Sequence, residues 1–259
     1  MGVTSLMDLS GKVAVVTGGS RGIGRQMAEA LGEMGAKVAI TARKEGELDE
    51  ARAHLAGIGV DCMTVAGDLS DPAAIAPVVD AVAAKWGHID ILVNNAGCNW
   101  GAVAEDYPND AWHKVMRLNI DAAFFLSREV AKRSMIERRS GKIVNIASIA
   151  GLGGYPPEWQ MYTAAYNTSK GALIALTRTL AAEWGRYNIN VNAICPGFFL
   201  SKMTAASLDR IEAMVLRATP LGRLGGVEDL KGTVAFLASE ASRHVTGQVL
   251  AVDGGCSAI

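Results

Sequence analysis

A tyrosine and a lysine four residues apart, Tyr166 and Lys170, form the pair in this chain best suited to acid–base chemistry. Residues 163–187 are rich in alanine and leucine, and their apolar positions recur at helical spacing, which predicts a helix. On a helix, both side chains lie on one face, one turn apart. A phenol has an ordinary pKa of about 10, and a neighbouring ammonium group lowers that pKa. The pair could therefore give a proton to a carbonyl oxygen or take one from an alcohol.

Tyrosine and lysine at this spacing also occur in helices that do no chemistry, with the tyrosine at a packing edge and the lysine in water. The surrounding chain favours the chemical interpretation. Residues 142–147 predict a strand that ends at Ser148, whose hydroxyl could bind the same oxygen atom as the phenol. A loop rich in glycine and proline then connects Ser148 to the helix that carries the tyrosine.

A glycine-rich turn near the N-terminus joins a predicted strand to a predicted helix. Residues 12–17 are apolar and β-branched, which is typical of a buried strand, and a helical pattern begins at Ile23. In this setting glycines let backbone N–H groups and the helix N-terminus face a pyrophosphate. A plain tight turn would show similar glycines, but the strand–turn–helix context favours phosphate binding. The residues of this predicted dinucleotide-binding turn are Gly18, Ser20, Arg21, Gly22, Ile23 and Gly24.

The residues after the second predicted strand, 36–41, indicate which dinucleotide the chain prefers. An NAD-specific site usually carries an acidic residue there, which binds the ribose 2′-hydroxyl. Here Ala42 is followed by Arg43 and Lys44, and Arg21 in the glycine turn adds a third cation. These cations could attract a 2′-phosphate, and no carboxylate stands at this position to oppose one. The sequence therefore predicts NADP(H) in preference to NAD(H), unless the three charges are only solvated.

Predicted strands alternate with predicted helices along the whole chain, which favours a parallel sheet covered on both faces. We expect an α/β Rossmann fold with one doubly wound, seven-stranded parallel sheet, forming a single domain over residues 1–259. Ligands in such sheets bind at the carboxyl ends of the strands, where Asp68, Asn95, Ser148 and Pro196 are expected. The remaining strands are predicted at 60–66, 89–93, 190–195 and 248–252.

Composition and charge exclude several classes of protein. The chain has 259 residues, half of them hydrophobic, and a formal net charge of −1, so no basic excess indicates nucleic acid or an anionic membrane. No apolar run approaches the roughly 18 residues of a membrane-spanning helix. The first ten residues lack the basic and apolar regions of a signal peptide, so we expect a cytoplasmic protein. The cysteines and histidines show no metal-binding spacing, and no metal site is predicted.

These motifs, in this order, resemble the short-chain dehydrogenase/reductase family. The resemblance covers nearly the whole chain. It rests on residues 17–24, 94–97, Asn119, Ser148, Tyr166 with Lys170, Pro196 with Gly197, and 252–255.

The resemblance implies a role for each of four residues. Tyr166 would be the general acid and base, and Lys170 would lower its pKa and hold the nicotinamide ribose. Ser148 would bind the substrate oxygen, and Asn119 would keep a water in a proton relay. The cofactor would be surrounded by Gly18, Ser20, Arg21, Gly22, Ile23, Gly24, Arg43, Asp68, Leu69, Asn95, Ala96, Gly97, Tyr166, Lys170, Pro196, Gly197 and Ser201.

The resemblance also implies the reaction and the assembly. We expect interconversion of a ketone and a secondary alcohol, acting on a small-molecule carbonyl or alcohol substrate. The family is commonly a homotetramer that is built on two long helices, here 110–138 and 163–187. One departure is that Ser148 and Tyr166 are 18 positions apart, more than in most relatives. The extra residues, near 153–160, should lie beside the substrate.

Two substrate classes fit the resemblance. A 3-oxoacyl thioester is favoured by a predicted lid at 198–226, where Leu208, Ile211, Met214 and Val215 suit an amphipathic helix, although an ordinary packed helix would look the same. Acyl carrier protein would then be a partner, with Arg139 and Arg186 as docking candidates.

A sugar acid, as in gluconate 5-dehydrogenase-like members, would need polar partners such as Asn99 and Glu105. A non-catalytic dinucleotide-binding regulator is a further alternative. It would tolerate the loss of Asn119, Ser148, Tyr166 or Lys170, yet all four are present.

Overall fold

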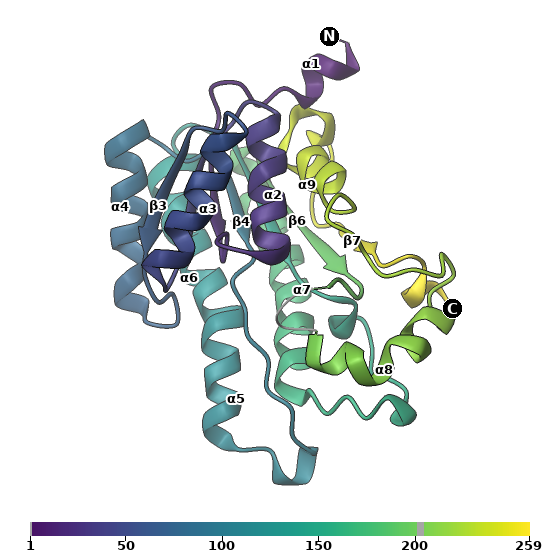
Figure 1. Ribbon diagram of the computed structural model, residues 1–259. Helices are drawn as coiled ribbons and strands as arrows, with labels where there is room; N and C mark the ends of the chain where they lie inside the picture. Colours follow the sequence, from purple (N-terminus) through teal and green to yellow (C-terminus); the bar gives the residue numbers. More distant parts are fainter. Residues whose placement is uncertain (1, 201–204) are drawn as a thin grey trace.

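The computed structural model describes residues 2–200 and 205–259, with side chains described for 2–200 and 210–259. Its strands form a seven-stranded, all-parallel sheet in the order β3-β2-β1-β4-β5-β6-β7 (Figure 1), which confirms the predicted fold class. The strands are β1 (Val13–Thr17), β2 (Lys37–Ala42), β3 (Cys62–Ala66), β4 (Ile91–Asn94), β5 (Gly141–Ile146), β6 (Ile189–Pro196) and β7 (Val249–Val252).

Helices pack on both faces of the sheet, because alternate residues of each buried strand point to opposite sides. Ala14 and Val16 of β1 join a core with α2, α3 and α9, whereas Val13 and Val15 join a second core with α4, α6 and α7. The helices are α1 (Val3–Met7), α2 (Gly22–Glu33), α3 (Glu45–Gly57), α4 (Ile75–Trp86), α5 (Asn109–Met116), α6 (Ala122–Val130), α7 (Ala164–Trp184), α8 (Ala205–Arg217) and α9 (Lys231–Ala238).

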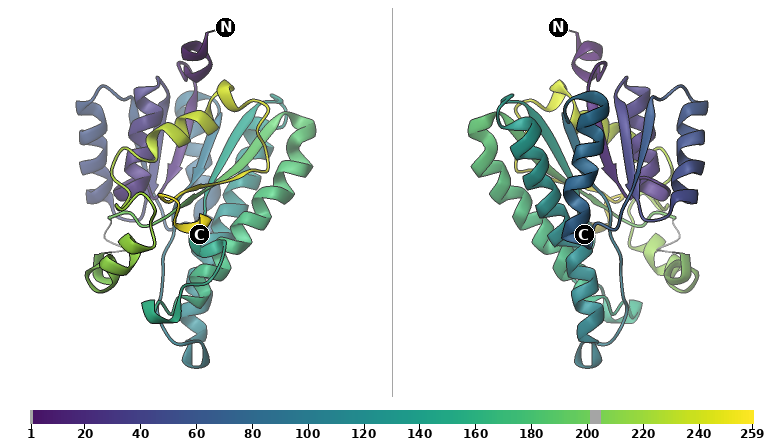
Figure 2. Two further views of the ribbon diagram at one scale, coloured as in Figure 1. Left: turned by 90° about the vertical axis from the view of Figure 1, so that its right-hand side faces the viewer. Right: turned by 90° about the vertical axis from the view of Figure 1, so that its left-hand side faces the viewer.

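The strand order reverses between β1 and β4, because β2 and β3 continue the sheet to one side and β5 to β7 to the other. Such a switch point leaves a crevice at the carboxyl ends of the strands. Helix α5 and the loop before it extend beyond this edge of the sheet (Figure 2). The segments that follow the strands therefore surround this edge of the sheet.

The predicted helix 110–138 differs in detail from the observed one. Two π-helical segments, Arg117–Asp121 and Ala131–Met135, interrupt it on either side of α6. Helix α5 begins after Pro108, and no side chain caps this end.

The last helix, α9, starts at Lys231, after turns formed by residues 227–230. Asp229 in these turns accepts a hydrogen bond from the Gly226 N–H and pairs with Arg223.

Over the part of the chain that the structure describes, none of the helices is both long enough and apolar enough to cross a membrane.

Candidate active site

The turn between β1 and α2 has a backbone conformation that residues other than glycine would adopt only with strain. Gly18 and Gly22 have φ angles of +64° and +55°, in the left-handed region that glycine adopts freely. A Cβ atom on Gly24 would overlap the carbonyl oxygen of Gly18. Asn95 fixes the turn from β4 by donating from Nδ2 to the carbonyl oxygens of Thr17 (2.8 Å) and Gly18 (3.2 Å). The turn therefore presents backbone N–H groups where an anion could approach closely.

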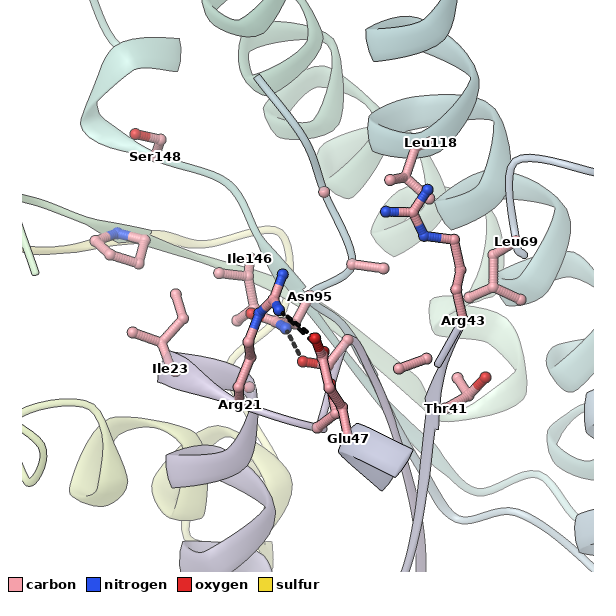
Figure 3. A pocket seen from close by; sticks show the side chains of 18 of the residues that line it. Arg21, Ile23, Thr41, Arg43, Glu47, Leu69, Asn95, Leu118, Ile146 and Ser148 are labelled. Atoms are coloured by element: carbon pink, nitrogen blue, oxygen red, sulfur yellow. Dashed lines mark hydrogen bonds and ion pairs between the residues drawn. The ribbon is translucent and has the colours of Figure 1, made fainter. Parts of the chain in front are cut away.

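A cavity of about 610 Å³ lies against this turn, at the carboxyl ends of the central strands (Figure 3). Its lining includes every predicted cofactor residue except Ser201, which lies outside the described residues. Ser148 also lines it, whereas Asn119 is buried and is not among the lining residues. Lys44, one of the three cations predicted to attract a 2′-phosphate, also lines the cavity. Lining residues that the sequence did not predict are Thr41, Ala42, Glu47, Gly67, Leu118, Ile146, Ala147 and Phe199.

Lys170 and Tyr166 lie on the same face of α7, one turn apart, as their spacing predicted. The Lys170 Nζ atom is 5.5 Å from the centre of the Tyr166 ring and donates to the carbonyl oxygen of Ile146 at 2.6 Å. Ser148 is buried at the end of β5, and its hydroxyl accepts a hydrogen bond from the Ala150 N–H (3.1 Å). A backbone group of β5 thus fixes Lys170, and a backbone group shortly after β5 fixes Ser148.

Asn119 is buried in the π-helical segment before α6. Its Nδ2 donates to the carbonyl oxygen of Cys98 and to Ser169 Oγ, both at 3.0 Å, and its Oδ1 accepts from the Cys98 N–H at 2.8 Å. Both amide N–H groups are therefore used. A water held by Asn119 would have to donate to it rather than accept from its side chain.

Burial dominates the electrostatics of the tyrosine and the lysine. It lowers the pKa of Lys170 to about 8. It also raises the pKa of Tyr166, while the hydrogen-bonding Ser148 hydroxyl works in the opposite direction. The lowering of the Tyr166 pKa that was expected from Lys170 is therefore not seen in the protein alone. Tyr166 is a neutral phenol near pH 7, able to donate a proton.

The buried lysine predicts how stability changes with pH. The pKa of Lys170 in the folded protein, about 8, lies below its ordinary value of 10.5, so the unfolded chain binds more protons between these pH values. The free energy of unfolding should rise with pH in this window, by at most about 1.4 kcal/mol per pH unit. Urea unfolding of the wild type and of Lys170→Met, across the window, would measure this. A constant difference between the two proteins would contradict the prediction.

The end of the cavity next to β2 and α3 carries a carboxylate, Glu47, in addition to the cations that the sequence indicated. Glu47, in the first turn of α3, pairs with Arg21 (2.8 Å) and with Lys44 (3.2 Å), as Figure 3 shows for Arg21. Arg43 is more weakly engaged, 3.9 Å from Asp68, and its side chain is 61% exposed. The prediction that no carboxylate opposes an anion here is therefore wrong. Glu47 follows Lys44 at helical i, i+3 spacing, which is the signal that could have revealed it.

The extra residues before α7 place an aromatic cluster next to Ser148. Tyr155 stacks on Trp159, with ring centres 5.8 Å apart, and both rings contact Phe198 after β6. Ile211 and Val215 of α8 are buried in the same hydrophobic cluster. The predicted lid thus packs its apolar face on the body at these two positions. The side chain of Leu208 lies outside the described residues.

The described residues fit a dinucleotide. A turn that only glycine can form faces the cavity, and α2 begins at Gly22 with its N-terminus toward the same space. Together, the doubly wound sheet and this cradle define a dinucleotide-binding α/β protein.

Comparisons with known proteins define the family more closely. A family model described as enoyl-(acyl carrier protein) reductase matches residues 18–257. The chain is 40% identical over 252 residues to gluconate 5-dehydrogenase of Gluconobacter oxydans, covering 96% of each. It is 38% identical over 249 residues to the 3-oxoacyl-[acyl-carrier-protein] reductase of Escherichia coli, covering 96% of this chain and 98% of that protein.

A solved structure of a gluconate 5-dehydrogenase from Burkholderia cenocepacia, in complex with NADP and tartrate, is similar with a TM-score of 0.93. It is 36% identical, and the match covers 100% of both chains. The chain belongs to the short-chain dehydrogenase/reductase family, as its motifs predicted, and is an oxidoreductase acting on alcohol and keto groups.

Proposed function

We propose that the protein reduces ketones to secondary alcohols, and catalyses the reverse reaction, with NADP(H) as its cofactor and Tyr166 as proton donor and acceptor. The observation that carries this proposal is the convergence of Tyr166, Ser148 and Lys170 on the dinucleotide cavity. Burial keeps Tyr166 a neutral phenol, the form needed to protonate a carbonyl oxygen during reduction.

The chain's own residues would bind and polarise the carbonyl group. Ser148 and Tyr166 would both donate hydrogen bonds to the substrate oxygen and stabilise the charge that develops on it. Lys170 would hold the ribose of the cofactor and, when charged, would assist ionisation of the phenol. When bound, the cofactor supplies or accepts the hydride. Asn119 would accept from a water that replenishes the Tyr166 proton.

The preference for NADP(H) rests on Arg43 in particular. Arg21 and Lys44 are already paired with Glu47, whereas Arg43 is exposed and only loosely paired. Arg43 is therefore the cation best placed to bind a 2′-phosphate. That several structures of relatives contain NADP supports the same preference.

Replacing Arg43 with alanine is expected to raise the KM for NADPH about tenfold or more, because a charge-assisted hydrogen bond is lost. The KM for NADH should change little, since NADH has no 2′-phosphate. Arg52→Ala is a matched control, because Arg52 is an exposed arginine of α3 that pairs with Asp49 outside the cavity. Steady-state kinetics with both cofactors would measure the effect, and equal losses for both would contradict the assignment.

An apolar 3-oxoacyl thioester is the substrate class we favour. Tyr155, Trp159 and Phe198 belong to the same hydrophobic cluster as Ala147 and Ile149, the neighbours of Ser148, so the surroundings of Ser148 are apolar on this side. The polar partners predicted for a sugar acid, Asn99 and Glu105, are exposed on the loop before α5. Asn99 also uses its Oδ1 atom to accept from the Trp100 N–H.

Acyl carrier protein is a proposed partner only through the relatives that act on it. The two predicted docking residues give no support, because Arg139 and Arg186 precede β5 and β6. They contact one another at the amino edge of the sheet, away from the cavity. A cytoplasmic location and a homotetramer likewise remain part of this proposal.

A gluconate 5-dehydrogenase activity is the second candidate, because relatives with that name are as similar to the chain as the carrier-protein reductases. An absorbance assay of NADPH and NADH oxidation would distinguish the two, with acetoacetyl thioesters, 5-ketogluconate and aromatic ketones as substrates. Turnover of the thioester would support the first candidate, and preference for the keto acid the second. Cofactor binding without turnover of any ketone would contradict the proposed function and favour a non-catalytic binding protein.

A further inference from the structure

The side-chain amide of Asn119 is held by two segments that are far apart in the sequence. From the loop after β4, the backbone of Cys98 donates to Oδ1 at 2.8 Å and accepts from Nδ2 at 3.0 Å. From α7, the Ser169 hydroxyl accepts from the same Nδ2 atom at 3.0 Å. Asn119 and Ser169 are 1% and 0% exposed, so water does not compete for these bonds. The amide therefore joins the loop after β4 to α7.

The hydroxyl of Ser169 can only accept from Asn119. Its single proton is donated to the carbonyl oxygen of Tyr166 at 2.8 Å, one turn earlier in α7. A carbonyl oxygen has no proton to give, so the direction of this bond is fixed. A serine hydroxyl has two lone pairs, and one of them accepts from Asn119 Nδ2. The bonds thus run in one direction, from Asn119 through Ser169 to the backbone of Tyr166.

The oxygen end of the Asn119 amide lies on the side of the reaction centre. A Cβ atom on Gly97 would be 3.2 Å from Asn119 Oδ1 and 3.7 Å from Lys170 Nζ, so both atoms border the same space. Gly97 and Lys170 line the dinucleotide cavity. Oδ1 has two lone pairs, and one of them accepts from the Cys98 N–H. Its second lone pair can therefore accept from a water near Lys170.

We propose that Ser169 is a positioning residue that holds Asn119 Nδ2 against α7 and so keeps Oδ1 directed to the water that replenishes the Tyr166 proton. This inference rests on the roles proposed above for Asn119 and Tyr166. Without the Ser169 hydroxyl, Nδ2 would keep only one of its two acceptors in a buried site. An unpaired buried N–H costs free energy, so the amide would turn toward a new acceptor and Oδ1 would leave its place beside Lys170.

Ser169→Ala tests the proposal, because alanine removes the hydroxyl and is favourable within a helix. We expect kcat for the best ketone substrate to fall about tenfold, with KM changed less than about threefold, as for the loss of one oriented hydrogen bond. NADPH binding, measured by fluorescence titration, should be unchanged, because Ser169 is buried and is not among the residues that line the cavity.

Thr177 provides a matched control on the same helix. Its hydroxyl is also fully buried, donates to the carbonyl oxygen of Leu173 in α7 (2.8 Å), and accepts from an asparagine, Asn145 Nδ2 (2.9 Å). Thr177→Val should therefore lower the free energy of unfolding as Ser169→Ala does. Thr177 lies about three turns from Tyr166, so kcat should stay unaltered. An equal fall in kcat for both variants would overturn the proposal.

A double-mutant cycle shows whether Ser169 acts through Asn119. In an Asn119→Ala background, Ser169→Ala should lower kcat no further, because no amide is left for the hydroxyl to hold. The losses in the free energy of unfolding, measured with urea on the same four proteins, should likewise be non-additive. An equal loss of kcat in both backgrounds would overturn the role of Ser169.

The unfolding measurements separate the possible failures. If the wild type reduces no ketone, the proposed function fails, while the unfolding cycle still decides whether Ser169 holds Asn119. Additive losses in the free energy of unfolding, together with an unchanged kcat for Ser169→Ala, would overturn the inference and leave the proposed function intact.

Discussion

Tyr166→Phe is expected to lower kcat by roughly 10² to 10⁴-fold, the usual contribution of a positioned acid or base, while NADPH still binds. The phenol is the group beside Ser148 that can transfer a proton, and phenylalanine keeps the ring above Lys170 without the hydroxyl. Stopped-flow and steady-state assays of NADPH oxidation would measure kcat, and fluorescence titration would measure binding.

Tyr187→Phe supplies the control for this experiment. Tyr187 follows α7 at the opposite edge of the sheet and does not line the cavity, so its variant should keep wild-type activity. Near-normal turnover by Tyr166→Phe would show that another group transfers the proton. The proposed mechanism would then be wrong, although the assignment of the chain to its family would not be affected.

Gly24→Ala is expected to abolish measurable NADPH binding. The added methyl group would overlap the carbonyl oxygen of Gly18 and the Nδ2 atom of Asn95, so the turn would have to move. A backbone carbonyl group cannot move aside as the end of a flexible side chain can. Overpacking of this kind also lowers the free energy of unfolding by about 1–3 kcal/mol. Calorimetric titration with NADPH and thermal unfolding would measure both effects.

Gly232→Ala provides the matched comparison. Gly232 lies near the start of α9, as Gly24 lies near the start of α2, but a Cβ atom there would meet nothing within 4 Å. Its variant should bind NADPH normally and be at least as stable as the wild type, because alanine favours helix. If Gly24→Ala bound NADPH as well as Gly232→Ala did, the turn could not be the pyrophosphate cradle.

Local patterns predicted most of the fold because the strands are short, apolar and β-branched, and each is followed by glycine or polar residues. The π-helical segment around Asn119 could not be predicted, because its sequence fits an α-helix equally well.

Site residues that belong to a sequence motif could be predicted. Residues that meet only when distant segments pack together could not. Tyr166 and Lys170 share one helix, so their spacing was sufficient. The contact of Phe198 with Tyr155 joins segments that no local pattern connects. Glu47 was not predicted because it lies in α3, beyond the end of β2 where an NAD-specific site carries its acidic residue.

The pairing of Glu47 with Arg21 and Lys44 changes how affinity at this end of the cavity should be understood. Arg21 places two hydrogen bonds on one carboxylate, at 2.8 and 2.9 Å, before any ligand arrives. A 2′-phosphate that docked here would exchange those ion pairs for new ones. The net gain would be the difference between two sets of charge contacts, both screened by water and salt. Selectivity for NADP(H) over NAD(H) would then depend on how well a 2′-phosphate competes with the Glu47 carboxylate for these cations.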